Sequence, residues 1–430
     1  MRQVARALAV VALAAVSAGA AEAGWVASWA AAQQVVEPNN MLPPAELTDA
    51  TLRQVVRLSI GGKAYRLLLS NAFGTAPLHL KSVHVARWRG GATIAPESDR
   101  ALTFSGASDV TIPAGAAYLS DPEPVVVAPL ADLAISIHYD TAPVVETGHP
   151  GSRMTSYVLA GDHTADASLA GAKMVDHWYQ IASIEVLAEP KASALAVVGD
   201  SITDGRGSTT NRNDRWTNIL AAQLQSHPAT RTTAVLNAGF GGNCVLSQCL
   251  GPNALSRLER DVLAPPGVTT VVVFEGINDL GRLTIDHPVP PPQHAALVAQ
   301  LIAGYQQIAV RAHGHGLKTY IGTILPYAGN ATYHPDAASE ADRTAVNTWI
   351  RAQKLYDGVI DFDVRLRDPA RADRLNPLYD SGDFLHPSPA GYRVMGELAA
   401  AVLQPAVTGN GLHSAAKPKP PRAPGKRKAR

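Results

Sequence analysis

The chain has little charge and little cysteine for its length. Charged residues make up 17% of its 430 residues, below the roughly 25% of a typical soluble domain. Hydrophobic residues make up 46%, which excludes wholesale disorder. The 37 Lys and Arg against 36 Asp and Glu leave no excess charge that would favour a nucleic acid as partner. Two cysteines close together in the sequence make a poor zinc site. The length predicts two or three domains with sizeable cores.

The near-neutral balance hides a basic C-terminus. Residues 417–430 contain seven Lys and Arg and no acid. Without this segment and without Arg2, Arg6 and Glu22, 28 basic residues face 35 acidic ones, a net charge of −7. Proline, lysine and arginine without apolar periodicity predict a disordered basic tail over residues 408–430. Its charge makes the tail a candidate for contact with an anionic surface.

The first 23 residues have the pattern of a secretory signal peptide. Arg2 and Arg6 precede an apolar stretch over residues 7–20, and residues 21–23 (AEA) provide a small-residue cleavage site. The apolar stretch is shorter than the roughly 20 residues that span a bilayer, and no later segment resembles a membrane span. We therefore expect cleavage near Ala23 and a secreted or periplasmic protein.

Export to an oxidising compartment bears on Cys244 and Cys249. We expect these two residues to form a disulfide rather than to stay free or bind a metal ion. Because the loop between them is short, the bond is expected to clamp that loop locally and to contribute about 2 kcal/mol.

From residue 24 to residue 190 the hydrophobic period is two. Residues 56–60 (VRLSI) and 133–139 (LAISIHY) alternate apolar and polar side chains, and clusters of Gly, Pro, Asn and Asp separate such runs. This pattern predicts an antiparallel, β-sandwich-like domain. Trp25, Trp29 and Trp178 allow either a sugar-stacking platform or core packing, and core packing is the favoured interpretation.

From residue 191 to residue 407 short apolar strands alternate with helical patterns. The strands are expected at residues 195–198, 234–236, 271–274, 320–325 and 359–362. Apolar strands separated by helices predict an α/β domain with a doubly wound, parallel, five-stranded sheet covered on both faces. Ligands of such sheets bind at the carboxyl ends of the strands.

Four polar blocks lie at these strand ends or in the last loop. They read GDSITDG (199–205), NAGFGGN (237–243), GIND (276–279) and DFLHP (383–387). Each block alone is an ordinary turn sequence. Thr203 stands where the α/β-hydrolase nucleophile elbow has its second glycine, which disfavours that fold. The order of the blocks and their common placement at one sheet edge indicate an active site.

In order and spacing the blocks resemble the SGNH, or GDSL-type, hydrolase superfamily over about residues 191–407. The segments WVASW (25–29) and SNAFG (70–74) also resemble the β-domain that precedes the catalytic domain in a secreted subgroup. The resemblance implies a flavodoxin-like catalytic domain that hydrolyses esters through an acyl-enzyme, without a metal or cofactor.

The resemblance also implies a role for each site residue. Ser201 is implied as the nucleophile, His386 as the general base and Asp383 as the residue that orients the base. The implied oxyanion donors are the N–H groups of Ser201 and Gly242 and the side-chain amide of Asn278. These roles fit the chemistry, because a serine hydroxyl needs a neutral imidazole to take its proton. A developing oxyanion likewise needs donors fixed in advance.

Other residues near the blocks are expected to support the site. Asp200 is expected to anchor the turn that holds Ser201, and Asp204 and Asp279 to cap or bridge loops. The stiff segment 287–292 (HPVPPP) is expected to border the substrate cleft.

We expect a serine esterase for acetylated carbohydrates or short-chain esters. The alternative within this class is a lysophospholipase or lipase-type acylhydrolase. Two other classes stay open: a non-catalytic polysaccharide-binding protein with a decayed hydrolase domain, and a metal-dependent phosphoesterase. The phosphoesterase would use Asp200, Asp279, Asp383 and His386 as ligands, and it leaves Ser201 unexplained.

Overall fold

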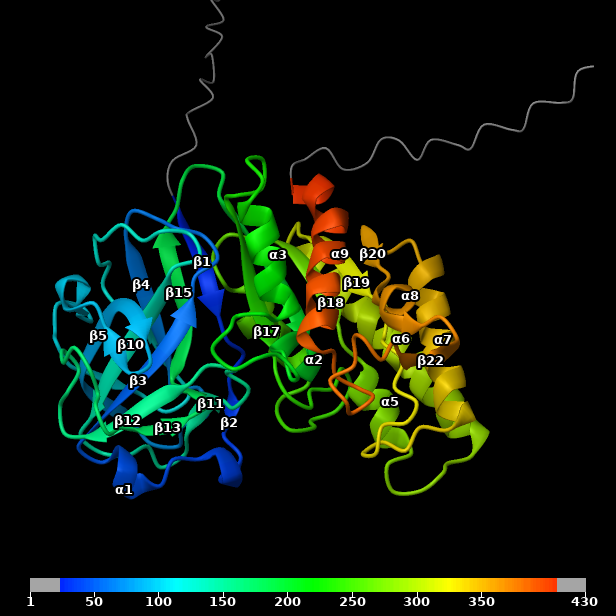
Figure 1. Cartoon of the computed structure of the whole chain (residues 1–430), viewed down its shortest axis with the longest axis horizontal. Helices are drawn as coiled ribbons and strands as arrows, with labels where there is room; N and C mark the ends of the chain where they lie inside the picture. The colour runs from blue at the N-terminus through cyan, green and yellow to red at the C-terminus, as the bar shows by residue number, and fades with distance from the viewer. Residues whose placement is uncertain (1–23, 408–430) are drawn as a thin grey trace, which may run out of the picture.

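The computed structural model describes residues 24–407 and contains two unlike parts (Figure 1). A β-rich region comes first in the chain, and an α/β region follows. The expected signal peptide and basic tail lie outside the described residues. Within residues 24–407, no helix combines the length and the apolar character needed to cross a membrane.

The β-rich region is built from antiparallel strands. A four-stranded sheet has the order β1 (Trp25–Ala30), β15 (Ile181–Leu187), β4 (Tyr65–Ser70), β9 (Ala117–Leu119). A larger sheet has the order β13 (Lys173–Val175), β12 (Ser156–Ala160), β3 (Ala50–Arg57), β10 (Asp132–Tyr139), β5 (Leu78–Gly90), β6 (Thr93–Ile94), and β5 also pairs with β7 (Arg100–Ala101) and β8 (Val110–Ile112). A small sheet joins β14 (Trp178–Tyr179), β11 (Thr147–His149) and β2 (Gln34–Val35), and one short helix, α1 (Pro44–Leu47), precedes β3. The antiparallel pairing expected for this region is confirmed.

The three tryptophans of this region differ in burial. Trp25 is partly buried, and the Arg66 guanidinium lies 4.3 Å from its ring centre. Trp29 and Trp178 are only 7% and 3% exposed, and their rings meet edge to face with centres 5.1 Å apart. The indole nitrogen of Trp178 donates to the carbonyl oxygen of Val55 at 3.0 Å. Because buried rings cannot stack on a sugar, core packing is confirmed for Trp29 and Trp178.

The α/β region contains a five-stranded sheet. Its order is β17 (Thr233–Gly239), β16 (Ser193–Gly199), β18 (Val268–Phe274), β19 (Lys318–Gly322), β20 (Gly358–Ile360). Each neighbouring pair is parallel, and the strand centres, such as Val197 and Val272, are fully buried. The second strand in the chain lies outside the first, and the remaining three lie on the other side, as in flavodoxin-like sheets.

Helices cover both faces of this sheet. The chain moves in one direction from β16 to β17 and in the opposite direction from β18 to β20. Because crossovers between parallel strands are right-handed, the reversal places α3 (Trp216–Gln225) on one face and α6 (Pro291–Gly314) and α7 (Ala337–Ala352) on the other. The last helix, α9 (Pro389–Val407), packs against α3, in front of the strands in Figure 1. Shorter elements complete the region: α2 (Ser201–Asp204), α4 (Ala254–Leu258), α5 (Ile277–Leu283), α8 (Phe362–Leu366), β21 (Arg367–Asp368) and β22 (Arg371–Leu375).

The two regions are joined along one edge of the parallel sheet. Strand β1 packs beside β17, the outermost strand, and Ala31 forms a parallel bridge with Asn237. The Ser59 hydroxyl donates to the carbonyl oxygen of Val235 at 2.7 Å. An open edge strand presents unpaired peptide groups, so the β-rich region covers an edge that would otherwise be exposed.

Candidate active site

The turn between strand β16 and Ser201 is held by a helix cap at Asp200 and by close packing at Gly199. Strand β16 ends at Gly199, and α2 begins at Ser201. Asp200 caps this helix, because its Oδ1 accepts a hydrogen bond from the N–H of Ile202 at 2.9 Å. A Cβ atom at Gly199 would lie 2.2 Å from Thr203 Oγ1, so glycine lets the strand end lie directly against α2. The expected anchoring role of Asp200 is confirmed.

Ser201 and His386 come together although 185 residues separate them in the sequence. Ser201 Oγ lies 2.8 Å from His386 Nε2. His386 Nδ1 lies 2.6 Å from Asp383 Oδ2. Because a carboxylate can only accept, Nδ1 carries the proton, and Nε2 has a free lone pair toward the serine hydroxyl. The three side chains therefore form a continuous Ser-His-Asp hydrogen-bonded chain.

Asp383 is held by its own loop as well as by the imidazole. Its Oδ1 accepts hydrogen bonds from the backbone N–H groups of His386, at 2.8 Å, and Leu385, at 3.0 Å. Asn330 donates to the Asp383 carbonyl oxygen at 2.9 Å. Partial burial favours the neutral acid, but the hydrogen bond and charge of His386 and the two backbone amides outweigh it and lower the pKa of Asp383 well below its usual value. An ionised carboxylate thus fixes the orientation of the imidazole.

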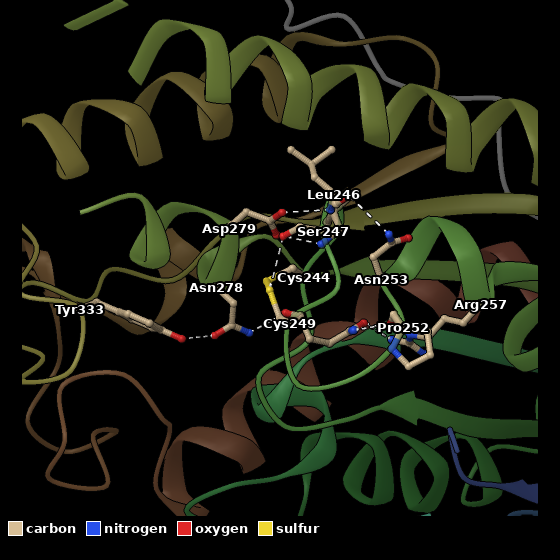
Figure 2. The surroundings of a disulfide bond; sticks show 12 residues. Cys244, Leu246, Ser247, Cys249, Pro252, Asn253, Arg257, Asn278, Asp279 and Tyr333 are labelled. Carbon is tan, nitrogen blue, oxygen red and sulfur yellow. Dashed lines mark hydrogen bonds between the residues drawn. A yellow bond between two sulfur atoms is a disulfide. The ribbon is translucent and has the colours of Figure 1, made fainter. Parts of the chain in front are cut away.

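Gly242 and Asn278 line the same cleft as Ser201. Gly242 has a φ of +66°, and a Cβ atom there would lie 2.6 Å from the side chain of Leu250. Asn278, at the start of α5, donates from Nδ2 to the carbonyl oxygen of Asn243 at 2.7 Å, while its Oδ1 accepts from the Tyr333 hydroxyl at 2.5 Å (Figure 2). These two bonds fix which end of the amide is nitrogen, and they leave one N–H of Nδ2 for another acceptor.

The loop after Gly242 is held by a disulfide and by a carboxylate. Cys244 and Cys249 are bonded, with Cα atoms 5.9 Å apart, so the expected disulfide is confirmed. Asp279 Oδ2 accepts from the N–H of Val245 at 2.8 Å, and its Oδ1 accepts from the N–H of Leu246 at 3.0 Å (Figure 2). Burial raises the pKa of Asp279 to about 6. Asp279 therefore bridges this loop to α5, as expected.

A buried arginine that the sequence analysis missed lies beneath the site. Arg257, on α4, donates to the carbonyl oxygens of Gly199 and Ala238, at 3.1 and 2.6 Å, and to Asn243 Oδ1 through two of its nitrogens. It thus ties the ends of β16 and β17 to the loop that contains Gly242. Burial raises the pKa of Asp200, which lies in the same region, to about 7, and nearby carboxylates add to this effect.

The β-rich region contributes two further groups that the sequence analysis missed. His149 Nε2 lies 2.8 Å from Asp204 Oδ1, and both side chains are almost fully buried. The other ring nitrogen of His149 faces the carbonyl oxygen of Ala32 at 2.8 Å. An Arg153 nitrogen lies 3.4 Å from Asp204 Oδ2. Burial opposes ionisation, but the charges of His149 and nearby arginines outweigh it and lower the pKa of Asp204. Asp204 therefore bridges α2 to the β-rich region.

These missed groups carried no usable signal in the sequence. Tyr333, Arg257 and His149 belong to no recognisable motif, and they lie on a loop, a helix and a strand that are far apart in the sequence. Only the topology, which brings distant segments to one sheet edge, identifies them.

A cleft of about 590 Å³ opens over Ser201. Every residue that the resemblance assigned to the site lines it. The remaining lining includes the arginines Arg153 and Arg206, polar Asn330 and Thr332, and two exposed apolar side chains, Leu250 and Phe384. The segment 287–292 is not part of the lining, so the expectation that it borders the cleft is wrong; residues 329–333 occupy that position instead.

The ligands required by the phosphoesterase alternative are used in other ways. Asp200 and Asp279 accept hydrogen bonds from backbone amides, and Asp383 holds His386. Over residues 24–407, no three His, Cys, Asp or Glu side chains gather in a group that could hold a metal ion.

Comparison with known proteins identifies the family of the α/β region. Residues 197–394 match the model of the GDSL-like Lipase/Acylhydrolase family. No curated protein matches the chain, whereas 80 chains of solved structures do. One is a lipolytic protein of the G-D-S-L family from Desulfitobacterium hafniense, with 22% identity and a TM-score of 0.37 over 49% of this chain and 99% of that one.

Two other solved structures are similar to the same extent. A GDSL-like lipase from Bacteroides thetaiotaomicron is 17% identical, with a TM-score of 0.36 over 52% of this chain and 92% of that one. A catalytic mutant of an acetylxylan esterase from Geobacillus stearothermophilus is 19% identical, with a TM-score of 0.36 over 50% of this chain and 94% of that one. The family match spans the α/β region from β16 to the start of α9. The α/β region is therefore a GDSL-like lipase/acylhydrolase domain, and the chain is a serine hydrolase that cleaves ester bonds.

Proposed function

We propose that Ser201 is the nucleophile of this hydrolase, that His386 is its general base and that Asp383 orients the base. Support comes from the continuous hydrogen-bonded chain, 2.8 Å from Ser201 to His386 and 2.6 Å from His386 to Asp383. In the first step Ser201 Oγ attacks the ester carbonyl carbon while His386 Nε2 takes the hydroxyl proton. The tetrahedral intermediate then collapses, and His386 returns that proton to the leaving alcohol. A water molecule, activated by the same imidazole, hydrolyses the acyl-enzyme.

The N–H groups of Ser201 and Gly242 and the free N–H of Asn278 Nδ2 are the donors we propose for the developing oxyanion. All three residues line the cleft, and the Asn278 amide is already fixed by Asn243 and Tyr333. Donors that are fixed before the reaction stabilise the transition state without reorganisation.

For the substrate, we propose acetylated carbohydrates or short-chain esters. Glycine, amide and hydroxyl groups make up much of the cleft lining, and Phe384 supplies one exposed aromatic face. A lipase-type acylhydrolase, the second candidate, would need a longer apolar groove for an acyl chain. Leu250 and Phe384 are the observation that favours it.

Secretion is a further part of the proposal. A disulfide between Cys244 and Cys249 is typical of exported proteins. Mass spectrometry of protein from a secreting host should find a mature chain that begins at Gly24. Recovery of the uncleaved chain would argue against the proposed signal peptide.

Labelling with a fluorophosphonate probe tests the catalytic proposal. The wild-type protein should become labelled, Ser201→Ala should not, and Ser256→Ala, which removes an exposed serine on α4, should label as the wild type does. A folded wild-type protein that stays unlabelled would support the non-catalytic alternative. Rates on p-nitrophenyl acetate and on longer acyl chains then separate the esterase from the lipase.

A further inference from the structure

The cleft contains two guanidinium groups whose charge the proposed reaction does not use. Arg153 reaches it from the β-rich region, and Arg206 from the turn that follows α2. Among the described residues that line the cleft, Asp383 is the single carboxylate, and it is engaged by His386. The cleft therefore has a local excess of positive charge, although the described part of the chain carries a net charge of −7.

Arg153 has an unusual backbone and an incompletely paired side chain. Its φ is +50°, a left-handed conformation that is costly for a residue with a side chain and that concentrates at functional sites. Its Nε is buried without a hydrogen-bond partner among the described residues, and its contact with Asp204 spans 3.4 Å. A guanidinium with five donors is thus only weakly engaged by the protein.

The Asp204 carboxylate does not fully neutralise the positive charge of Arg153. Asp204 is already hydrogen-bonded to His149 at 2.8 Å, and the charge of buried Arg215 also acts on this carboxylate. Arg215 itself donates to the carbonyl oxygen of Ser152. Two guanidinium groups therefore share one carboxylate, which leaves positive charge on the side of the cleft.

Arg206 is placed to act together with Arg153. Its backbone N–H donates to the carbonyl oxygen of Ser201 at 2.9 Å, and its carbonyl oxygen accepts from the Tyr392 hydroxyl. The main chain is thus fixed beside the nucleophile. The side chain is exposed, and none of the described residues pairs with its guanidinium.

We propose that Arg153 and Arg206 form a subsite for a negatively charged group on the substrate, which makes the β-rich region a determinant of specificity. The proposal rests on the ester hydrolysis proposed above. The planar, bidentate guanidinium matches a carboxylate or a phosphate. Because the amide of Asn330 and the hydroxyl of Thr332 line the same cleft as the two guanidinium groups, we assign the subsite to the carboxylate of an acidic sugar ester rather than to a lipid headgroup.

A matched pair of esters tests the subsite. The anion 4-acetoxybenzoate and its neutral methyl ester carry the same acetyl group and differ by one charge. The wild type should prefer the anion, and this preference should weaken with added NaCl. Arg206→Gln and Arg153→Gln should each raise KM for the anion about tenfold to a hundredfold, while kcat and the neutral ester change less than threefold. Arg393→Gln, which removes an exposed arginine of α9 outside the cleft lining, should match the wild type.

The outcomes separate the subsite from the catalytic proposal. If the wild type hydrolyses both esters equally well and Arg206→Gln changes neither, the subsite is overturned and the catalytic proposal stands. If no ester is hydrolysed and no fluorophosphonate labelling occurs, the catalytic proposal itself fails. A preference for 4-acetoxyphenyl phosphate over 4-acetoxybenzoate, lost in Arg206→Gln, would support the subsite and assign phosphate as its ligand. Exposed Arg206 keeps the test valid even if Arg153→Gln does not fold.

Discussion

The side chain of Asn278 is held at both ends, which makes it a defined test of the proposed oxyanion site. Asn278→Ala removes the donor and should lower kcat by about 10²–10³ with a smaller change in KM. The control is Tyr333→Phe, which keeps the amide but loses the hydroxyl that fixes Oδ1; it should lower kcat by a smaller factor. Wild-type turnover by a folded Asn278→Ala protein would remove Asn278 from the proposed site.

Buried Asp200 makes a second residue-scale prediction, which concerns stability and pH. Its pKa is raised to about 7 in the folded protein, above the unfolded value, so its stabilising contribution is complete below the unfolded pKa and is lost as pH rises through about 7. Asn is neutral at every pH and can still accept from Ile202. The free energy of unfolding of Asp200→Asn relative to wild type should therefore increase between pH 4 and pH 8, by roughly a few kcal/mol.

Urea titrations at several pH values measure this difference. Asp383→Asn is the matched control, because folding lowers the pKa of Asp383. The difference in unfolding free energy between this variant and the wild type should therefore change with pH in the opposite direction. Its stability cost should be largest at neutral pH and disappear as pH falls through the range where Asp383 takes up its proton. A pH-independent difference for Asp200→Asn would contradict the raised pKa.

A site residue could be predicted from the sequence only when it belongs to a local motif. Ser201, Asp383 and His386 lie in short blocks whose spacing implied their positions, and the structure brings the three together. Tyr333 and Arg257 make equally direct contacts with the site loops. Tyr333 approaches from a loop whose conformation no periodicity specifies. Arg257 approaches from helix α4, and the apolar spacing of that helix does not reveal that its arginine is buried beneath the site.

Among the elements, the loop that follows Gly242 depends on its disulfide. Replacing both Cys244 and Cys249 by serine should reduce the free energy of unfolding by about 2 kcal/mol, because the bond closes a short loop. It should also lower kcat, since Gly242 lies two residues before the bonded Cys244. Urea denaturation and steady-state kinetics measure both effects. The wild type treated with a thiol reductant should reproduce them, and an unchanged kcat would separate the disulfide from the position of Gly242.

The strands and helices were easier to predict from the sequence than the loops between them. The parallel strands were predictable because burial on both faces leaves continuous apolar runs, and β16 and β18 lie where those runs occur. The position of segment 287–292 was predicted wrongly because its prolines make it stiff but do not determine where in the fold the segment runs. Residues 291–292 begin α6, where proline suits the first turn of a helix, and the cleft is instead bordered by residues 329–333.

Across the whole molecule, the buried His149–Asp204 pair couples the β-rich region to the helix that begins with Ser201. His149→Ala leaves the Asp204 carboxylate buried without its closest partner, and it should cost about 3–5 kcal/mol of unfolding free energy. Adding Asp204→Asn to this variant should cost less than the two single changes together, because both disrupt one interaction. Urea denaturation of the three variants measures the coupling.

The matched control for this cycle is an exposed pair of the same type. His79 and Asp140 are 2.9 Å apart, and both side chains are about 30% exposed. His79→Ala should therefore cost only about 0.2–1 kcal/mol. Equal costs for His149→Ala and His79→Ala would show that the pair beneath α2 does not join the two regions.

The position of β1 has a consequence for how the chain folds. Trp25 pairs with Leu187, and β1 also packs beside β17, so the first strand of the described chain acquires its neighbours only after most of the β-rich region and part of the next have been made. Contacts between such distant segments slow folding, because loop closure must precede the gain from pairing. The first strand is therefore expected to be among the last to join the structure.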